Sequence, residues 1–169
     1  CFLVIQNLKK ILQSKNLSTN VGDEGGFAPL INSNEEALDL IVQAIEKSNL
    51  KPGVDISICL DVAANELINK DGKYSLNSAE FISVDDSINY YKSLVSNYPI
   101  KSIEDPFAED DWSAWSRLTK EIGKNVQIVG DDLFVTNVTR LKRGIKEKSA
   151  NSILIKVNQI GTLTETLDV

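Results

Sequence analysis

An alternation of short apolar runs with amphipathic helical segments constrains the fold of this chain more than any other feature. Four runs are rich in Ile and Val and have the length of buried strands: DISICLD (55–61), PIKSIED (99–105), VQIVGDD (126–132) and NSILIKV (151–157). A segment with helical periodicity precedes each run: 33–49, 83–98, 111–123 and about 138–150. This rhythm predicts an α/β fold in which crossover helices connect parallel strands.

The helical segments carry apolar stripes that predict core-facing surfaces. The stripe of 33–49 is Ala37, Leu40, Ile41, Ala44 and Ile45, that of 83–98 is Val84, Ile88, Tyr91, Val95 and Tyr98, and that of 111–123 is Trp112, Trp115, Leu118 and Ile122. Ser33 and Glu36 match a capping box, and Gly123 is a helix stop signal. The N-terminal stretch 1–13 is also amphipathic and predicts a helix. These stripes indicate packing and carry no chemistry.

Each of the four predicted strands ends at a charged residue: Asp61, Glu104, Asp131 and Lys156. The carboxyl ends of parallel strands lie on one side of the sheet, which in a (β/α)₈ barrel is the side where active sites are built. The alternative is that each acid caps a helix or faces solvent. Bringing four charges together is costly unless they are paired or bind a metal, and this cost favours a functional site.

Three carboxylates beside one ammonium suit a particular chemistry. Their hard oxygen ligands suit Mg²⁺, with Mn²⁺ as a possible substitute, whereas zinc would favour His or Cys and the sequence has no His. A nearby cation lowers the pKa of Lys156, so that its neutral amine can accept a proton. The metal would stabilise the charge formed when that proton leaves a carbon beside a carboxylate.

The stretch GDEGGF (22–27) places Asp23 and Glu24 side by side among glycines, which predicts an irregular turn. Taken alone, the turn has two readings. It is either an exposed acidic turn, or it holds a carboxyl group over a reacting atom.

Composition excludes some classes of partner. The net charge of −6 argues against nucleic acid, and no apolar run approaches the roughly 20 residues that span a bilayer. The two cysteines, Cys1 and Cys59, form no disulfide framework. They indicate a reduced compartment, and we expect a cytoplasmic location.

Four motifs closely resemble the enolase family: VGDEGGFAP, SIEDPFAEDDW, VGDDLFVTN and KVNQIGTLTE, in this order. The resemblance spans essentially all 169 residues. It implies that 1–169 is the central part of the family's C-terminal catalytic domain, a TIM-like (β/α)₈ barrel, covering roughly strands three to six with their crossover helices. The family's N-terminal domain and last barrel strands would lie outside this sequence, so we expect 1–169 alone to be inactive.

The resemblance also implies an activity, the reversible dehydration of 2-phosphoglycerate to phosphoenolpyruvate in glycolysis and gluconeogenesis. Such an enzyme is a Mg²⁺-dependent hydro-lyase. Lys156 matches the family's general base at C2, and Glu24 matches the general acid at the leaving 3-hydroxyl. A carboxyl in this role needs a raised pKa, through burial or neighbouring acids.

The metal ligands are implied in the same way. Asp61, Glu104 and Asp131 match the family's ligands of the Mg²⁺ that stabilises the enolate intermediate, and Asp132 matches a residue that orients its neighbours. Val62 and Ala63 follow Asp61, at positions where families of this kind vary.

Two other readings stay open. Racemases and cycloisomerases of the same superfamily also place strand-end acids around Mg²⁺, and a second catalytic Lys on the strand upstream would favour them. A binding role at the cell surface or in an RNA-degradation assembly would be non-enzymatic, and the location of the native protein would discriminate it. The family implies a small-molecule substrate and a homo-oligomer, either a dimer or an octamer.

Overall fold

The computed structural model describes residues 1–76 and 80–169. They form two compact units, residues 1–57 and 58–169. Among the described residues, every helix is too short or too polar to span a bilayer.

The first unit is built on two helices that pack against each other, α1 (Phe2–Ser14) and α2 (Asn34–Lys47). Both helices predicted for this region are therefore confirmed. Its buried core comprises Val4, Ile11, Leu12, Leu40, Ala44 and Ile45. Ser33 Oγ accepts the Glu36 N–H at 3.1 Å, while the Glu36 carboxylate accepts the N–H of Asn32, one residue before the expected partner.

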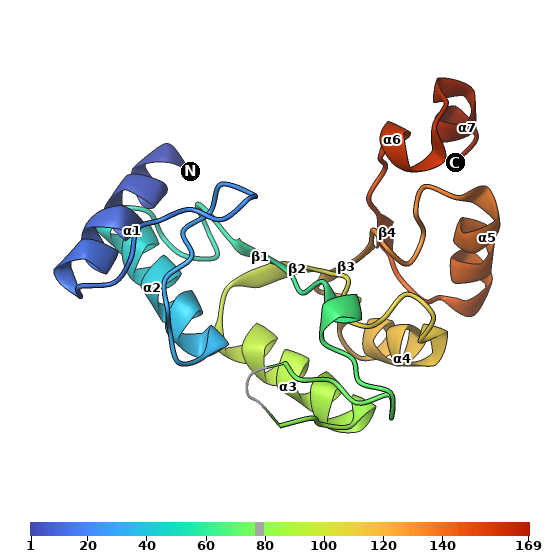
Figure 1. Ribbon diagram of the computed structural model, residues 1–169, viewed down its shortest axis with the longest axis horizontal. Helices are drawn as coiled ribbons and strands as arrows, with labels where there is room; N and C mark the ends of the chain where they lie inside the picture. The colour runs from blue at the N-terminus through green and yellow to red at the C-terminus, as the bar shows by residue number, and fades with distance from the viewer. Residues whose placement is uncertain (77–79) are drawn as a thin grey trace. The chain divides into compact units, whose positions relative to one another are not determined.

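The second unit contains a four-stranded parallel sheet in which the strands follow their order in the sequence (Figure 1). The strands are β1 (Ile58–Asp61), β2 (Ile100–Glu104), β3 (Gln127–Gly130) and β4 (Ser152–Ile153). Each lies within one of the four apolar runs, so the predicted parallel α/β arrangement is confirmed. The hydrogen-bonded strands are shorter than the runs: Asp61 and Glu104 end β1 and β2, whereas Asp131 and Lys156 lie beyond the ends of β3 and β4.

Helices connect these strands. They are α3 (Val84–Asn97), α4 (Trp112–Ile122) and α5 (Val138–Glu147), and a short 3-10 helix, η1 (Ala64–Glu66), follows β1. Two short helices, α6 (Val157–Ile160) and α7 (Leu163–Asp168), follow β4. Side chains cap several N-termini: Ser83 accepts the N–H of Asp86, Asp111 that of Ala114, and Asn137 those of Thr139 and Arg140.

The helix faces match the predicted stripes closely for α4 and partly for α3. All four apolar residues predicted for α4 are buried, and Gly123 follows its last turn. On α3, Ile88 and Tyr91 are buried as predicted, but Ser87 and Leu94 complete the buried face. Val84, Val95 and Tyr98 are only partly buried. The buried face is therefore rotated from the predicted one, because Ser87 is small and its hydroxyl donates to the Ser83 carbonyl inside the helix.

The loop between β2 and α4 is held by aromatic contacts and hydrogen bonds. Phe107 contacts Tyr74 and Tyr91 edge to face, with ring centroids 5.2 and 5.7 Å away. The Tyr91 hydroxyl donates to the Pro106 carbonyl at 2.7 Å. The Trp115 indole N–H donates to the Ala108 carbonyl at 3.0 Å. This loop directly follows Glu104, so its packing fixes the backbone beside the predicted site.

Candidate metal and catalytic site

The sheet register brings the four charged strand ends to one face of the sheet. Asp61 pairs with Glu104, Glu104 with Val129, and Val129 with Ser152. Asp131 directly follows the end of β3, Lys156 follows the end of β4, and the contact between their side chains brings both to these strand ends. The convergence predicted from spacing is thus observed for these four residues, each placed at or beyond the carboxyl end of its strand.

The carboxylates form two overlapping groups that share Asp105. Oxygen atoms of Asp61, Glu104 and Asp105 lie within 4.8 Å of one another, and so do those of Asp105, Asp131 and Asp132. Among the described residues, Asp61 and Asp131 do not fall in one such group. The predicted ligand trio is therefore connected through Asp105, which the sequence analysis did not single out.

Lys156 reaches the buried Asp131 carboxylate across the gap between two adjacent strand ends. Its ammonium donates to Asp131 Oδ2, in an ion pair whose Lys156 side chain is half-exposed. The Gln159 amide donates to the other oxygen, Asp131 Oδ1, at 2.6 Å. Both oxygens of Asp131 therefore have fixed partners.

The buried hydroxyl of Thr136 connects the backbone of Lys156 with the side chain of Gln159. Thr136 is fully buried; its hydroxyl accepts the Lys156 N–H at 2.9 Å and donates to the Gln159 side-chain carbonyl at 2.8 Å. Lys156, Thr136, Gln159 and Asp131 therefore form a closed ring of hydrogen bonds. Sequence analysis missed Thr136 and Gln159, although both lie inside quoted motifs, because neutral polar residues give no charge signal.

Charges and burial shift the pKa values of three site residues. Burial raises the pKa of Glu104 to about 6, with further contributions from Asp61, Asp105 and Asp131. Burial also raises the pKa of Asp105 to about 6, against the opposing effect of two backbone N–H donors. The hydrogen bond to Asp131 raises the pKa of Lys156, so the ammonium form is favoured here.

The donor set fits a hard divalent cation. All its members are carboxylates on adjacent strand ends, and Mg²⁺ prefers oxygen ligands. Burial is the main cause of the raised pKa of Glu104, and the neighbouring carboxylates add to it; a bound cation would offset this added repulsion. Asp61, Glu104 and Asp131 could bind such an ion, with Asp105 and Asp132 beside them.

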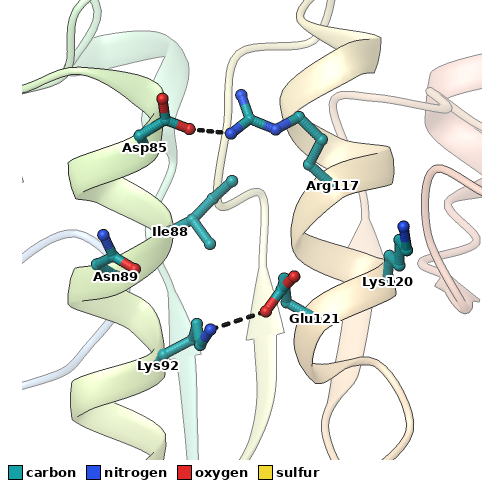
Figure 2. A pocket seen from close by; sticks show the side chains of 7 residues that line it. All are labelled: Asp85, Ile88, Asn89, Lys92, Arg117, Lys120 and Glu121. Carbon is teal, nitrogen blue, oxygen red and sulfur yellow. Dashed lines mark hydrogen bonds and ion pairs between the residues drawn. The ribbon is translucent and has the colours of Figure 1, made fainter.

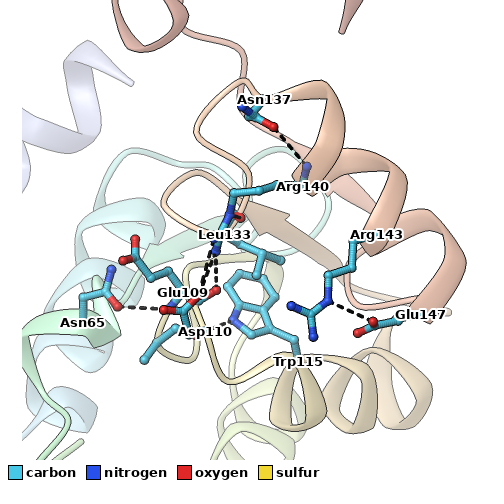
Figure 3. Close-up of polar contacts among 10 residues, drawn as sticks. Asn65, Glu109, Asp110, Trp115, Leu133, Asn137, Arg140, Arg143 and Glu147 are labelled. Atoms are coloured by element: carbon cyan, nitrogen blue, oxygen red, sulfur yellow. Dashed lines mark hydrogen bonds and ion pairs between the residues drawn. The ribbon is translucent and has the colours of Figure 1, made fainter.

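A second network holds the loops around the site together (Figure 3). The Asn65 amide donates to Asp132 Oδ2 at 2.9 Å, and its carbonyl accepts the Glu109 N–H at 3.0 Å. Arg140 donates to the carbonyls of Leu133 and Glu109, at 2.5 and 2.6 Å. The loops that follow β1, β2 and β3 are therefore connected, which agrees with an orienting role for Asp132.

Glu24 belongs to the first unit. The turn is closed by an antiparallel bridge between Val21 and Phe27 and by a Gly22 N–H bond to the Gly26 carbonyl at 2.9 Å. Gly25 has φ of +80°, which favours glycine at that position. Glu24 is exposed on this turn. The irregular turn predicted from GDEGGF is confirmed, and the acid role of Glu24 stays a prediction.

A groove of about 370 Å³ between α3 and α4 is a separate feature (Figure 2). Two exposed ion pairs cross it, Lys92 with Glu121 at 2.7 Å and Arg117 with Asp85. Its lining comes from the two helices and includes none of the strand-end residues. Four of its charged residues form these two pairs across the groove, so we interpret it as a contact between the helices.

Comparison with known proteins finds a matching family model and a similar curated relative. Residues 2–169 match the family model described as "Enolase, C-terminal TIM barrel domain". The enolase of Pelagibacter ubique is 65% identical over 169 residues, a match that covers all of this chain. The chain spans 40% of the length of that relative.

Proposed function

The chain belongs to the enolase family through its C-terminal barrel domain, and on this premise we propose that the protein carrying it interconverts 2-phosphoglycerate and phosphoenolpyruvate. The observation that carries the proposal is the placement of Lys156 against Asp131, beside the carboxylates of Glu104 and Asp61 at one set of strand ends. A base beside a cluster of carboxylate ligands is what removal of a proton next to a carboxylate requires.

Lys156 is the proposed base at C2. Its backbone N–H is held by Thr136 and its side chain reaches Asp131, so the amine is kept at the strand-end face. It acts in the neutral form, which requires that the carboxylates favouring its ammonium be compensated. The Gln159 bond to Asp131 keeps that carboxylate oriented while Lys156 exchanges its proton.

Asp61, Glu104 and Asp131 are the proposed ligands of Mg²⁺, and Mn²⁺ is a possible substitute. When bound, Mg²⁺ would stabilise the negative charge that develops on the substrate as the C2 proton leaves. Asp132, held by Asn65, would keep the turn after β3 in place.

Glu24 is the proposed general acid. Its carboxyl would donate a proton to the 3-hydroxyl as the C–O bond breaks, so that water departs. In the first unit Glu24 is exposed on the glycine-rich turn, and its assignment as the acid is carried by the family motif.

The wider setting is part of the same proposal. Residues 1–169 would form the central part of the barrel domain, in a homo-oligomeric protein of the cytoplasm. Sedimentation of the full-length protein measures the oligomeric state, and cell fractionation measures the location.

The test is an assay of the purified full-length protein with 2-phosphoglycerate, following phosphoenolpyruvate by its ultraviolet absorbance. We expect formation with Mg²⁺, loss after chelation, and recovery when Mg²⁺ or Mn²⁺ is returned. The control is Asp71→Asn, at an exposed turn position, which should leave the rate unchanged. A metal-replete protein that forms no phosphoenolpyruvate would overturn the proposal.

A further inference from the structure

Asp105 is a buried acid at the centre of the strand-end face that the proposed reaction leaves without a role. It is 4% exposed and follows β2 directly. Its φ of +42° is uncommon outside glycine and is best tolerated by Asn and Asp. A buried carboxylate needs strong partners, and those of Asp105 come from the backbone of neighbouring strand ends.

Both carboxylate oxygens of Asp105 accept backbone N–H groups from the turn after β3. Oδ1 accepts the Asp131 N–H at 3.1 Å, and Oδ2 accepts the Asp132 N–H at 3.0 Å. Hydrogen bonds to an ionised acceptor are about twice as strong as neutral ones. The carboxylate therefore determines where the backbone of Asp131 and Asp132 lies.

The backbone of Asp105 makes two further bonds to neighbouring strand ends. Its N–H donates to the Val129 carbonyl at 3.0 Å, and its carbonyl accepts the Ala64 N–H at 3.1 Å. One residue thus connects the segments that follow β1 and β2 with both β3 and its turn. Asp61 and Glu104 directly precede the first two of these segments, and the turn after β3 begins with Asp131; these are the three proposed ligands.

We propose that Asp105 is a positioning residue, a clasp that sets the spacing of the proposed metal ligands without itself binding the metal. The expected effect on metal binding rests on the proposed function. The ordering of the turn by Asp105 rests only on its hydrogen bonds to the N–H groups of Asp131 and Asp132. The alternative is that Asp105 is a ligand, because its oxygens lie within 4.8 Å of those of both neighbouring groups. The two interpretations differ in the metal-free protein. If Asp105 is a clasp, it orders the turn after β3 without metal, whereas a residue that acts only as a ligand does not.

The test compares Asp105→Asn with the unmodified full-length protein by residue-resolved hydrogen exchange without metal. Asn suits the positive φ, so the substitution removes the charge and one acceptor with little backbone strain. We expect the amides of Asp131 and Asp132 to exchange at least about tenfold faster, as loss of bonds to a charged acceptor implies. Asp71→Asn removes the same charge from an exposed turn and should change neither amide.

The second readout is Mn²⁺ affinity, measured by the electron paramagnetic resonance of free Mn²⁺. We expect Asp105→Asn to weaken binding about 10- to 100-fold, the range for residues that orient ligands. Weaker binding with unchanged exchange at 131 and 132 would make Asp105 a ligand and overturn the clasp. Faster exchange spread evenly over residues 58–169 would indicate general loss of stability and would also overturn it.

The unmodified protein supplies an independent check if Asp105→Asn fails to fold. The clasp requires both amides, of Asp131 and Asp132, to be protected in the metal-free protein, and unprotected amides would contradict it. The two proposals can fail separately. If both amides are protected but the protein neither binds Mn²⁺ nor forms phosphoenolpyruvate, the proposed function is contradicted and the ordering of the turn by Asp105 is still supported.

Discussion

The carboxylates at the carboxyl ends of the strands differ in burial and in hydrogen-bond partners. These differences predict different effects of substitution. Asp131 is buried between Lys156 and Gln159, whereas Asp61 is exposed and accepts the Ala63 N–H at 3.2 Å. Asp132 contacts Asn65. A proposed ligand and an orienting neighbour can therefore be separated by experiment.

The first prediction concerns the ligands. Replacing Asp61, Glu104 or Asp131 by Ala in the full-length protein removes a coordinating oxygen. Mg²⁺ binding should then weaken by more than the roughly 10- to 100-fold expected for an orienting residue, the range we expect for Asp132→Ala. Calorimetric titration of each variant measures this. An Asp131→Ala protein with unchanged affinity would remove Asp131 from the ligand set.

The second prediction concerns pH. Burial raises the pKa of both Glu104 and Asp105 to about 6, from ordinary values of 4.5 and 3.8. A proton on Glu104 then competes with the metal, and a proton on Asp105 weakens its bonds to the turn that carries Asp131. Mg²⁺ affinity should therefore be nearly constant above pH 7 and fall as pH drops below about 6. The stability of the metal-free protein has the opposite pH dependence. Because the pKa values of both acids are raised in the folded state, the folded state favours their protonated forms. Their contribution is present below pH 4 and is lost as pH rises through 6.

The pH prediction is checked by thermal unfolding and titration between pH 4.5 and 8. Glu104→Gln should reduce the pH dependence of metal-free stability. An Mg²⁺ affinity that rises on acidification would contradict the assigned direction.

At the scale of single residues, the sequence predicted which charged residues lie at strand ends but not which atoms they contact. Asp61, Glu104, Asp131 and Lys156 could be found because each ends an apolar run. Asp105 could not be distinguished from a solvated neighbour, because its role depends on the N–H groups of Asp131 and Asp132, which reach it only through the β2–β3 register.

At the scale of elements, the turn after β3 and helix α5 are coupled by one aromatic ring. Phe134 is 2% exposed. A Cβ added at Gly130 would lie 2.6 Å from its ring, and one at Gly144 would lie 2.3 Å from it. Both glycines are therefore required by close packing against the turn that carries Asp131.

The third prediction is that Gly144→Ala destabilises the protein although Ala is the better helix former. The helix propensity gain is about 1 kcal/mol, but the ring cannot move freely and overpacking typically costs about 1–3 kcal/mol. We expect a net loss, measured by urea unfolding. Lys142→Ala, at an exposed position of α5, is the control and should be nearly neutral. Adding Phe134→Leu should recover part of the loss, and a stabilised Gly144→Ala protein would contradict the packing argument.

Elements were predicted well where periodicity was strong and less well where a small polar residue was buried. The Trp112, Trp115, Leu118 and Ile122 stripe of α4 was read correctly. The face of α3 was not, because Ser87 satisfies its hydroxyl inside the helix and packs without an apolar signal.

At the scale of the molecule, the described sheet has two open edges. β1 and β4 each pair with one described neighbour, and the segment after β4 exposes Leu163 and Leu167. A barrel removes such edges by closing on itself. Apolar side chains and unpaired edges of this kind promote association with other chains.

The fourth prediction is that residues 1–169 expressed alone form no phosphoenolpyruvate and associate. The strand-end groups would lack the fixed geometry that catalysis needs, and a misplacement of about 1 Å can already cost about 10²-fold in rate. The assay is run beside sedimentation, with the full-length protein as control. A monomer of 1–169 with activity would show that the sheet is self-sufficient.

The most direct test of the account is exchange of the substrate C2 proton with solvent, measured by NMR in deuterated buffer with the metal-saturated full-length protein. Lys156→Ala should abolish exchange, because Lys156 is the proposed acceptor of that proton. Glu24→Gln should retain measurable exchange while losing turnover, because it cannot donate a carboxyl proton to the leaving hydroxyl. Exchange that survives Lys156→Ala, or that Glu24→Gln stops as completely, would contradict the assigned division between base and acid.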